Sequence, residues 1–176
     1  MESDRTSSNS LSSLLDELPP FLFVGGIHGV GKSTLCDSTF TPAGYHCVTA
    51  SSLIRLYRTH SDRAKLVDDI PDNQAALLKQ LELEKDTRSH LLLDGHFCLL
   101  NGQGIVEPIE IDVFNEMAPS ALLLVKCEPE VIAVRLNNRD GKNWSPEMLR
   151  DFQAAEANHA VRISEALRVG LTTVDP

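Results

Sequence analysis

The chain of 176 residues has no hydrophobic run long enough to cross a membrane, and it is poor in basic residues. Its 16 lysines and arginines stand against 25 aspartates and glutamates, which gives a formal net charge of −9. Because a general nucleic-acid-binding protein needs a basic face, this balance argues against that class. The N-terminal segment also lacks the apolar core of a secretory signal. We therefore expect a cytoplasmic protein with no membrane segment and no nucleic-acid partner.

The four cysteines lack the spacing of a metal site or of a disulfide framework. Cys36, Cys47, Cys98 and Cys127 are scattered, with no C-x-x-C pair, and three of them lie in or beside apolar runs. This distribution favours buried free thiols over disulfides or a metal site. The chain also shows no internal repeat. Its length and its 42% of hydrophobic residues fit one domain with a substantial core.

The N-terminal segment differs in composition from the rest of the chain. Residues 1–13 are rich in Ser, Asp and Asn, which predicts disorder. Leucines at positions 11, 14, 15 and 18 recur at helical spacing, and the proline pair at 19–20 would end a helix there. We expect residues 1–20 to form a disordered or short helical tail, and residues 21–176 to form the folded domain.

The most informative motif is a complete phosphate-binding loop, G-x-x-x-x-G-K-[ST], at residues 26–33. Its glycines let backbone N–H groups turn inward around an anion, Lys32 can reach the β- and γ-phosphates, and the Ser33 hydroxyl can ligate Mg²⁺. An apolar run at 21–24 precedes the loop and a helical sequence follows it, as this motif requires. The sequence therefore predicts binding of ATP with Mg²⁺. The residues assigned to nucleotide binding are Gly26, His28, Gly29, Val30, Gly31, Lys32, Ser33 and Thr34.

From residue 21 onward, apolar runs typical of strands alternate with helical segments. Strands are expected at 21–25, 46–49, 90–94, 121–126 and 171–174. Helices are expected after the loop to about residue 40, and at 51–59, 72–85, 107–117, 129–138 and 146–168. This alternation predicts an α/β fold of the P-loop NTPase type, a three-layer sandwich whose five-stranded parallel sheet carries helices on both faces. Ligands in such folds bind at the carboxyl ends of the strands.

Asp94 ends the apolar run at residues 90–93 and is predicted to lie one strand away from the phosphate loop. A carboxylate at this place can hold Mg²⁺ opposite Ser33. The alternative is a turn or cap residue beside Gly95. The neighbouring phosphate loop favours the metal role, so we assign the metal to Ser33 and Asp94.

Arg135 and Arg139 lie four residues apart and so share one face of a predicted helix. Phosphoryl transfer needs cations on the migrating group, because its equatorial oxygens carry charge in the transition state. The alternative is a solvated helix face on which Arg139 pairs with Asp140. A Gly-Lys-Asn segment follows at once and favours a small lid around residues 139–147. We therefore predict that Lys32, Arg135 and Arg139 are catalytic.

A second phosphate site is predicted after the strand at 46–49. A serine there begins a helix, and Arg55 lies one turn inside it. Two phosphate sites on one sheet edge suit a kinase rather than a simple hydrolase, although Arg55 could merely be solvated. His28 and His96 are candidates for ligand contacts or for filling space; in-line transfer needs no general base, so neither receives an acid–base role. Ser52, Arg55 and His96 are the predicted acceptor-binding residues.

Together these motifs resemble those of nucleoside monophosphate kinases of the adenylate kinase group, and most of all archaeal-type adenylate kinases and nuclear adenylate-kinase-like ATPases. The similarity covers residues 21–174. Its most specific elements are the loop G-I-H-G-V-G-K-S-T and the R-x-x-x-R-D of residues 135–140. Residues 49–55 resemble the acceptor segment, which ends in a phosphate-binding arginine, and residues 94–96 resemble the D-x-H element of this group. Gln153 and Glu156 resemble positions in the helix that follows the lid.

The resemblance implies a kinase that moves the γ-phosphate of ATP to a nucleotide-sized acceptor, above all a nucleoside monophosphate. A sugar, a coenzyme precursor or an RNA end stays open as the acceptor, because Arg55 recognises phosphate rather than base. The segment after the arginine pair carries only Lys142, where the family has further arginines. This thin lid keeps a second hypothesis open, an ATP-binding, slowly hydrolysing switch or assembly protein that acts through a protein partner or a homo-oligomer.

Overall fold

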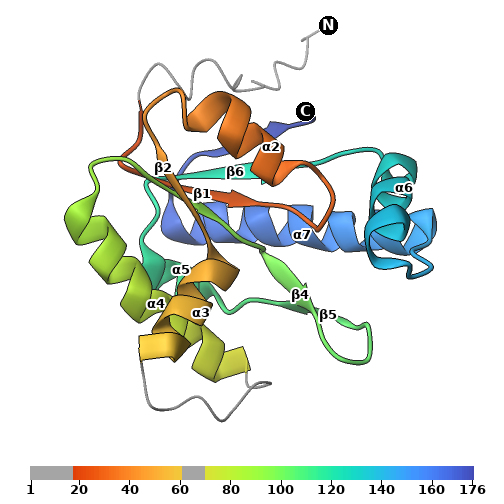
Figure 1. The fold of residues 1–176 in the computed structure, drawn as a ribbon, viewed down its shortest axis with the longest axis horizontal. Coiled ribbons are helices and arrows are strands. Elements are labelled where there is room, and N and C mark those ends of the chain that lie inside the picture. Colours follow the sequence, from red (N-terminus) through yellow and green to blue (C-terminus); the bar gives the residue numbers. More distant parts are fainter. Residues whose placement is uncertain (1–17, 61–69) are drawn as a thin grey trace, which may run out of the picture.

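The structure is a computed structural model that describes residues 18–60 and 70–176 (Figure 1). Its central sheet has five parallel strands in the order β2-β3-β1-β6-β7. In chain order these strands are β1 (Phe21–Gly25), β2 (His46–Thr49), β3 (Leu91–Asp94), β6 (Ala121–Val125) and β7 (Leu171–Val174). The predicted five-stranded parallel sheet is therefore confirmed.

Helices cover both faces of this sheet (Figure 1). They are α2 (Lys32–Leu35), which continues as a π-helical turn η1 (Cys36–Phe40), then α3 (Ala50–His60), α4 (Ile70–Thr87), α5 (Ile111–Met117), α6 (Pro129–Asp140) and α7 (Pro146–Leu167). Alternate side chains of β1 enter two different cores. Leu22 and Val24 pack with η1, α6 and the start of α7, whereas Phe21 and Phe23 pack with α3, α4, α5 and the rest of α7. Burial on both faces explains why the strands are apolar throughout, and it confirms the three-layer sandwich.

The segment after β3 departs from the sequence prediction. A helix was expected at residues 107–117, but the chain forms an antiparallel hairpin of β4 (Cys98–Leu100) and β5 (Val106–Pro108) before α5 begins at Ile111. The Asn101 side chain closes the turn by accepting from the N–H groups of Gln103 and Ile105, at 2.9 and 3.0 Å. The prediction of a helix from residue 107 was wrong because the Asn-Gly turn signal was assigned to a loop alone.

The strand register brings three chain segments to one edge of the sheet. Asp94, the last residue of β3, pairs with Val24 of β1 on one side and with Thr49 of β2 on the other. The phosphate loop, the start of α3 and the β3 carboxylate therefore meet at the carboxyl ends of the strands, as expected for ligand sites in parallel sheets.

Two further expectations concern the N-terminal tail and the presence of a membrane-spanning helix. Of the tail predicted at residues 1–20, residues 1–17 lie outside the described residues; Leu18 packs on the core, and the Pro19 carbonyl accepts from the Tyr45 hydroxyl at 2.8 Å. None of the helices that the structure describes combines the length and apolar character needed to cross a membrane.

Candidate functional site

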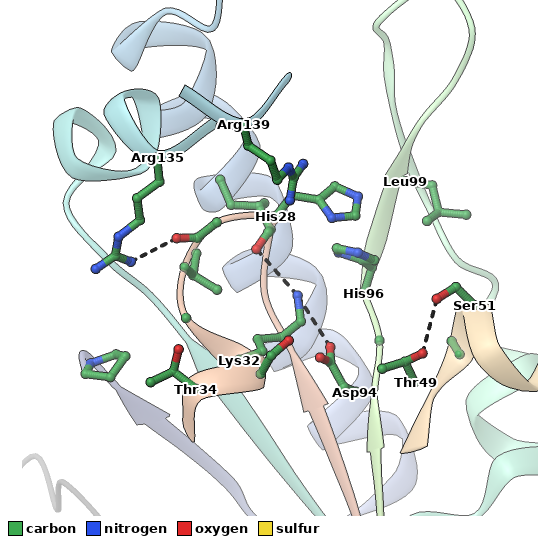
Figure 2. A pocket seen from close by; sticks show the side chains of 18 of the residues that line it. His28, Lys32, Thr34, Thr49, Ser51, Asp94, His96, Leu99, Arg135 and Arg139 are labelled. Atoms are coloured by element: carbon green, nitrogen blue, oxygen red, sulfur yellow. Dashed lines mark hydrogen bonds and ion pairs between the residues drawn. The ribbon is translucent and has the colours of Figure 1, made fainter. Parts of the chain in front are cut away.

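The loop between β1 and α2 requires glycine at several positions. Gly26, Gly29 and Gly31 have φ of 148°, 84° and 108°, a region that side-chain-bearing residues rarely adopt. A Cβ at Gly26 would also lie 2.5 Å from the carbonyl oxygen of Val125. The loop curls at the sheet edge beside a cavity of about 820 Å³, shown in Figure 2.

This cavity gathers most of the residues predicted from the sequence. Its polar lining comes from the loop, the ends of β2 and β3, the start of α3, and α6. The polar residues that line it are His28, Lys32, Ser33, Thr34, Thr49, Ser51, Asp94, His96, Arg135 and Arg139. Gly29, Val30 and Gly31 line it as well, whereas Gly26 contributes its carbonyl to the Lys32 side chain. The predicted nucleotide, metal and arginine positions thus share one cavity.

Lys32 lies in the floor of the loop and is almost fully buried. Its Nζ donates to the carbonyl oxygen of Gly26 at 2.5 Å. The same Nζ lies 3.6 Å from Oδ1 of Asp94 (Figure 2). Burial lowers the pKa of Lys32 and raises the pKa of Asp94, and the attraction between the two charges opposes both shifts only in part. Asp94 compensates the burial of this ammonium only in part, and a bound phosphate group would add further negative charge beside it.

Ser33 and Asp94 fit the expected metal chemistry. Ser33 is exposed at the first turn of α2, Asp94 stands at the end of the adjacent strand, and both line the cavity. Within the described residues, no group of three or more His, Cys, Asp or Glu side chains forms a metal cluster. Mg²⁺ in phosphate sites is commonly bound through one or two protein oxygens plus the substrate phosphates. The residues present therefore fit Mg²⁺ brought with a nucleotide rather than a metal held by protein alone.

The two arginines of α6 have different partners. Arg135 donates from Nη1 to the carbonyl oxygen of Gly29 at 2.9 Å, so its guanidinium lies against the phosphate loop (Figure 2). Arg139 makes a two-pronged pair with Asp140, at 2.5 and 2.8 Å. Both side chains line the cavity, but the carboxylate of Asp140 already occupies the guanidinium of Arg139. The pair of Arg139 with Asp140 that the sequence offered as an alternative is therefore present.

Beside the loop, the imidazoles of His28 and His96 lie against each other, with ring centroids 4.4 Å apart. Burial, followed by the positive charges around them, lowers the pKa of His28 to about 4 and that of His96 to about 3. Both rings are therefore neutral at neutral pH. Behind them, Nδ1 of His96 lies 3.3 Å from Oε1 of Glu156, a fully buried carboxyl of α7 whose pKa burial raises to about 7.

A second, apolar pocket of about 220 Å³ opens beside the first. Its walls come from β1, α3, α4, α5 and the turn after β3. The lining residues are Phe23, Ala50, Ile54, Asn73, Gln74, Leu77, Gly95, His96, Leu99, Ile109, Val113 and Met117. Five of these, Ala50, Ile54, Gly95, His96 and Leu99, also line the phosphate-loop cavity. The two spaces therefore meet at the end of β3.

The predicted acceptor residues are placed unequally with respect to these spaces. His96 lines both of them. Ser52 is engaged in capping α3: its hydroxyl donates to the Thr49 carbonyl at 2.7 Å. Arg55 is exposed on α3 and does not line either pocket, whereas the preceding residue, Ile54, lines both. The structure thus brings His96 to the junction, whereas Ser52 and Arg55 are exposed and line neither pocket.

Comparison with known proteins agrees with this architecture. A family model described as an AAA domain matches residues 25–151. The chain belongs to this AAA domain family. An adenylate kinase from Thermoplasma acidophilum is 26% identical over 159 residues, which cover 85% of this chain and 84% of that protein.

Solved structures share the fold of this AAA domain. A shikimate kinase from Bacteroides thetaiotaomicron has a TM-score of 0.54 at 15% identity, covering 88% of this chain and 86% of the other. A gluconokinase from Sinorhizobium meliloti has a TM-score of 0.51 at 15% identity, covering 90% and 85%. Likeness at these identities concerns the fold. The AAA domain match and the similarity to an adenylate kinase confirm the predicted resemblance to adenylate kinase-like P-loop proteins.

Several residues around the site of this AAA domain received no role from the sequence. Asn137 holds the segment after α6 by accepting from the N–H of Trp144 at 2.7 Å and donating to its carbonyl at 3.3 Å. Gln153 and Glu156 were matched to a helix without a function. Their position in the sequence could have indicated a structural role. They lie on the same helix face as Phe152, Ala160 and other apolar residues, and a polar side chain buried on such a face needs a hydrogen-bonding partner.

Proposed function

We propose that this protein transfers the γ-phosphoryl group of ATP to a small acceptor, with a nucleoside monophosphate as the first candidate. The observation that carries the proposal is the junction of the phosphate-loop cavity with the apolar pocket at His96 and Leu99. Two ligands can lie end to end across this junction, one with its phosphates in the loop and one with an apolar ring in the pocket. A simple ATPase has no use for the second pocket.

On the donor side, the loop amides and Lys32 bind the β- and γ-phosphates. Ser33 and Asp94 hold Mg²⁺, which neutralises phosphate charge when bound. Arg135, already against the loop, is placed to contact the transferring group, where equatorial oxygens carry charge. Transfer then depends on positioning and electrostatics rather than on a base, which agrees with the neutral, weakly basic imidazoles of His28 and His96.

On the acceptor side, the apolar pocket suits a flat ring such as a nucleobase, because Phe23, Leu77 and Met117 provide apolar walls while Asn73 and Gln74 offer hydrogen-bonding groups. The reactive end of the acceptor would face His96 and the loop. Arg55 is exposed on α3, and we propose that it binds an acceptor phosphate.

A direct test is to incubate the protein with ATP, Mg²⁺ and a panel of ribo- and deoxynucleoside monophosphates, nucleosides and phosphorylated sugars. Products are identified by chromatography. We expect at least one phosphorylated acceptor, formed in equal amount to ADP. Arg55→Ala is expected to reduce the use of a phosphorylated acceptor while the dissociation constant of ATP is unchanged. Formation of ADP and inorganic phosphate alone, with every acceptor, would contradict the proposal.

A second candidate is an ATP-binding switch that hydrolyses slowly and acts through a protein partner. The observation that favours it is the pair of Arg139 with Asp140, which leaves Arg135 as the α6 arginine bound directly to the loop. Size-exclusion chromatography with ADP and with a non-hydrolysable ATP analogue tests this candidate. A nucleotide-dependent change in oligomeric state, without acceptor phosphorylation, would support the switch over the kinase.

A further inference from the structure

Helix α7 carries three buried polar side chains at a spacing of three residues: Gln153, Glu156 and His159, exposed to 7%, 1% and 6%. Residues at this spacing follow one side of a helix. Each of the three reaches the backbone of a different connection in the fold. We call these three residues the polar ladder of α7.

Gln153 holds the connection between β6 and α6. Its Oε1 accepts from the N–H of Cys127 at 3.1 Å, and its Nε2 donates to the carbonyl of the same residue at 2.8 Å. Cys127 lies two residues before α6, the helix that carries Arg135. The Gln153 amide therefore sets where the arginine helix begins relative to the sheet.

Glu156 holds the turn between β3 and β4. Its Oε2 accepts from the N–H of Phe97 at 2.7 Å, and its Oε1 faces Nδ1 of His96 at 3.3 Å. This turn follows Asp94 directly and carries His96, whose side chain lines both pockets. Glu156 therefore fixes the β3 side of the phosphate cavity.

His159 holds the connection between β5 and α5. Its Nε2 lies 2.6 Å from the carbonyl oxygen of Ile109, and the N–H of Ile109 in turn donates to the Phe97 carbonyl at 3.0 Å. Ile109 forms part of the wall of the apolar pocket. His159 thus supports the wall of the apolar pocket, which is the proposed acceptor side of the site.

We propose that the polar ladder of α7 is a positioning device that fixes three parts of the site relative to one another: the arginine helix, the β3 edge and the acceptor wall. The inference rests on the proposed function for its acceptor readout. A purely apolar α7 could fill the same core, but it would leave the backbone groups at these three connections without a buried partner. Reacting groups need alignment to within a fraction of an ångström, and a shift of about 1 Å can cost about 100-fold in rate.

The test uses variants of similar volume. Gln153→Met removes both bonds to Cys127, Glu156→Leu removes the acceptor for the Phe97 N–H, and His159→Phe keeps an aromatic ring but loses the contact with Ile109. The matched control is Ser164→Ala on the same helix, which removes a 2.7 Å bond to the Val169 carbonyl at the far end of α7. All four are measured for thermal midpoint, ATP dissociation constant, kcat and acceptor KM.

We expect Q153M and E156L to lower kcat by about 10- to 100-fold while the ATP dissociation constant stays within about twofold. H159F is expected to raise acceptor KM by about 5- to 10-fold with kcat largely kept, because its direct partner, Ile109, lies in the wall of the apolar pocket. S164A should lower the thermal midpoint without changing any kinetic constant. Should E156L fail to fold, Glu156→Asp keeps the carboxyl group but shortens its reach to Phe97, and the same loss of kcat is expected.

The proposal is overturned if the ladder variants, compared at equal folded fraction, keep wild-type kcat and acceptor KM as S164A does. This outcome is distinct from failure of the proposed function. If the wild type phosphorylates no acceptor, kcat for ATP hydrolysis takes the place of transfer. A loss of that kcat in Q153M and E156L, with S164A unaffected, still supports the ladder, and no loss overturns it.

Discussion

The two pockets that meet at His96 are lined by different kinds of chemical groups. The phosphate-loop cavity is formed by main-chain turns and charged side chains, with Lys32 and Asp94 at its floor. The apolar pocket is formed by side chains such as Phe23 and Met117, contributed by elements far apart in the sequence. Backbone geometry determines the first and side-chain identity the second. The chemistry on the donor side is therefore constrained by the fold, whereas acceptor choice depends on residues that can change without altering it.

The largest expected effect is on the donor side alone. Lys32→Ala should lower phosphoryl transfer by about 10³-fold, because it removes a buried cation from the charge that develops in the transition state. The measurement is steady-state ADP formation with excess acceptor. Lys79→Ala, on α4 with its ammonium over the Tyr57 ring, is the control and should keep wild-type turnover. Turnover in K32A near the wild-type rate would remove the loop from the mechanism.

A slightly smaller effect is expected at the β3 edge. Asp94→Asn keeps the size of the side chain but removes the carboxylate that faces Lys32 and the metal position. We expect turnover to fall by about 100-fold and the Mg²⁺ concentration for half-maximal activity to rise. A Mg²⁺ titration of activity checks both. An unchanged Mg²⁺ dependence would assign Asp94 to the support of Lys32 rather than to the metal.

The acceptor side can be blocked without touching the donor side. Gln74→Trp, on α4, should fill the apolar pocket, which Gln74 lines without lining the phosphate-loop cavity, and raise acceptor KM by about 10-fold or more, while the ATP dissociation constant stays within about twofold. Titration calorimetry with ATP and initial rates against acceptor concentration measure the two effects separately. Equal losses in both would show that the two pockets do not bind different ligands.

A pH effect of intermediate size is expected from Glu156. Burial raises its pKa from 4.5 to about 7, so between these values the folded chain holds a proton that the unfolded chain has lost. The free energy of unfolding therefore falls as pH rises from about 5 to 7, by on the order of 2 kcal/mol relative to Glu156→Gln. His28 and His96, whose pKa values are lowered, act in the opposite direction, and both proteins share them. Denaturant unfolding at pH 5 and 7 gives the comparison; parallel pH profiles would refute this account of Glu156.

The smallest effect concerns the exposed pair on the donor side. Asp140→Asn frees Arg139 from its carboxylate, and we expect turnover to rise by about two- to fivefold with no shift in the thermal midpoint, since exposed pairs add little stability. Asp151→Asn, an exposed carboxylate on α7, is the control. A fall in turnover for D140N would mean that the pair holds Arg139 in its working position.

The donor side could be predicted from the sequence because its residues follow one another in short motifs. The loop at residues 26–33, the strand before it and the acid at Asp94 carry their spacing in the chain, and the parallel sheet follows from the alternation of elements. The assignments of individual roles to these residues stay predictions. Their shared cavity is what the structure adds.

The rest of the site could not be predicted because it depends on tertiary packing. The apolar pocket combines Phe23, Ile54 and Met117, residues that look like ordinary core positions in the sequence. Arg55 carried the acceptor prediction on local pattern, but which side of α3 faces the junction is set by packing on the sheet, and Ile54 lies there. Glu156 gains its neighbours only when α7 folds back across the turn after β3.

The central claim is that the two adjoining pockets make one site for transfer between two ligands. Phosphorus NMR of the protein with ATP, Mg²⁺ and a saturating acceptor tests it most directly, because ADP, inorganic phosphate and a phosphorylated acceptor give separate signals. The account predicts that ADP and phosphorylated acceptor grow in equal amounts, and that Gln74→Trp suppresses the acceptor product while ATP still binds. Equal growth of ADP and inorganic phosphate, unaffected by any acceptor or by Gln74→Trp, would contradict it.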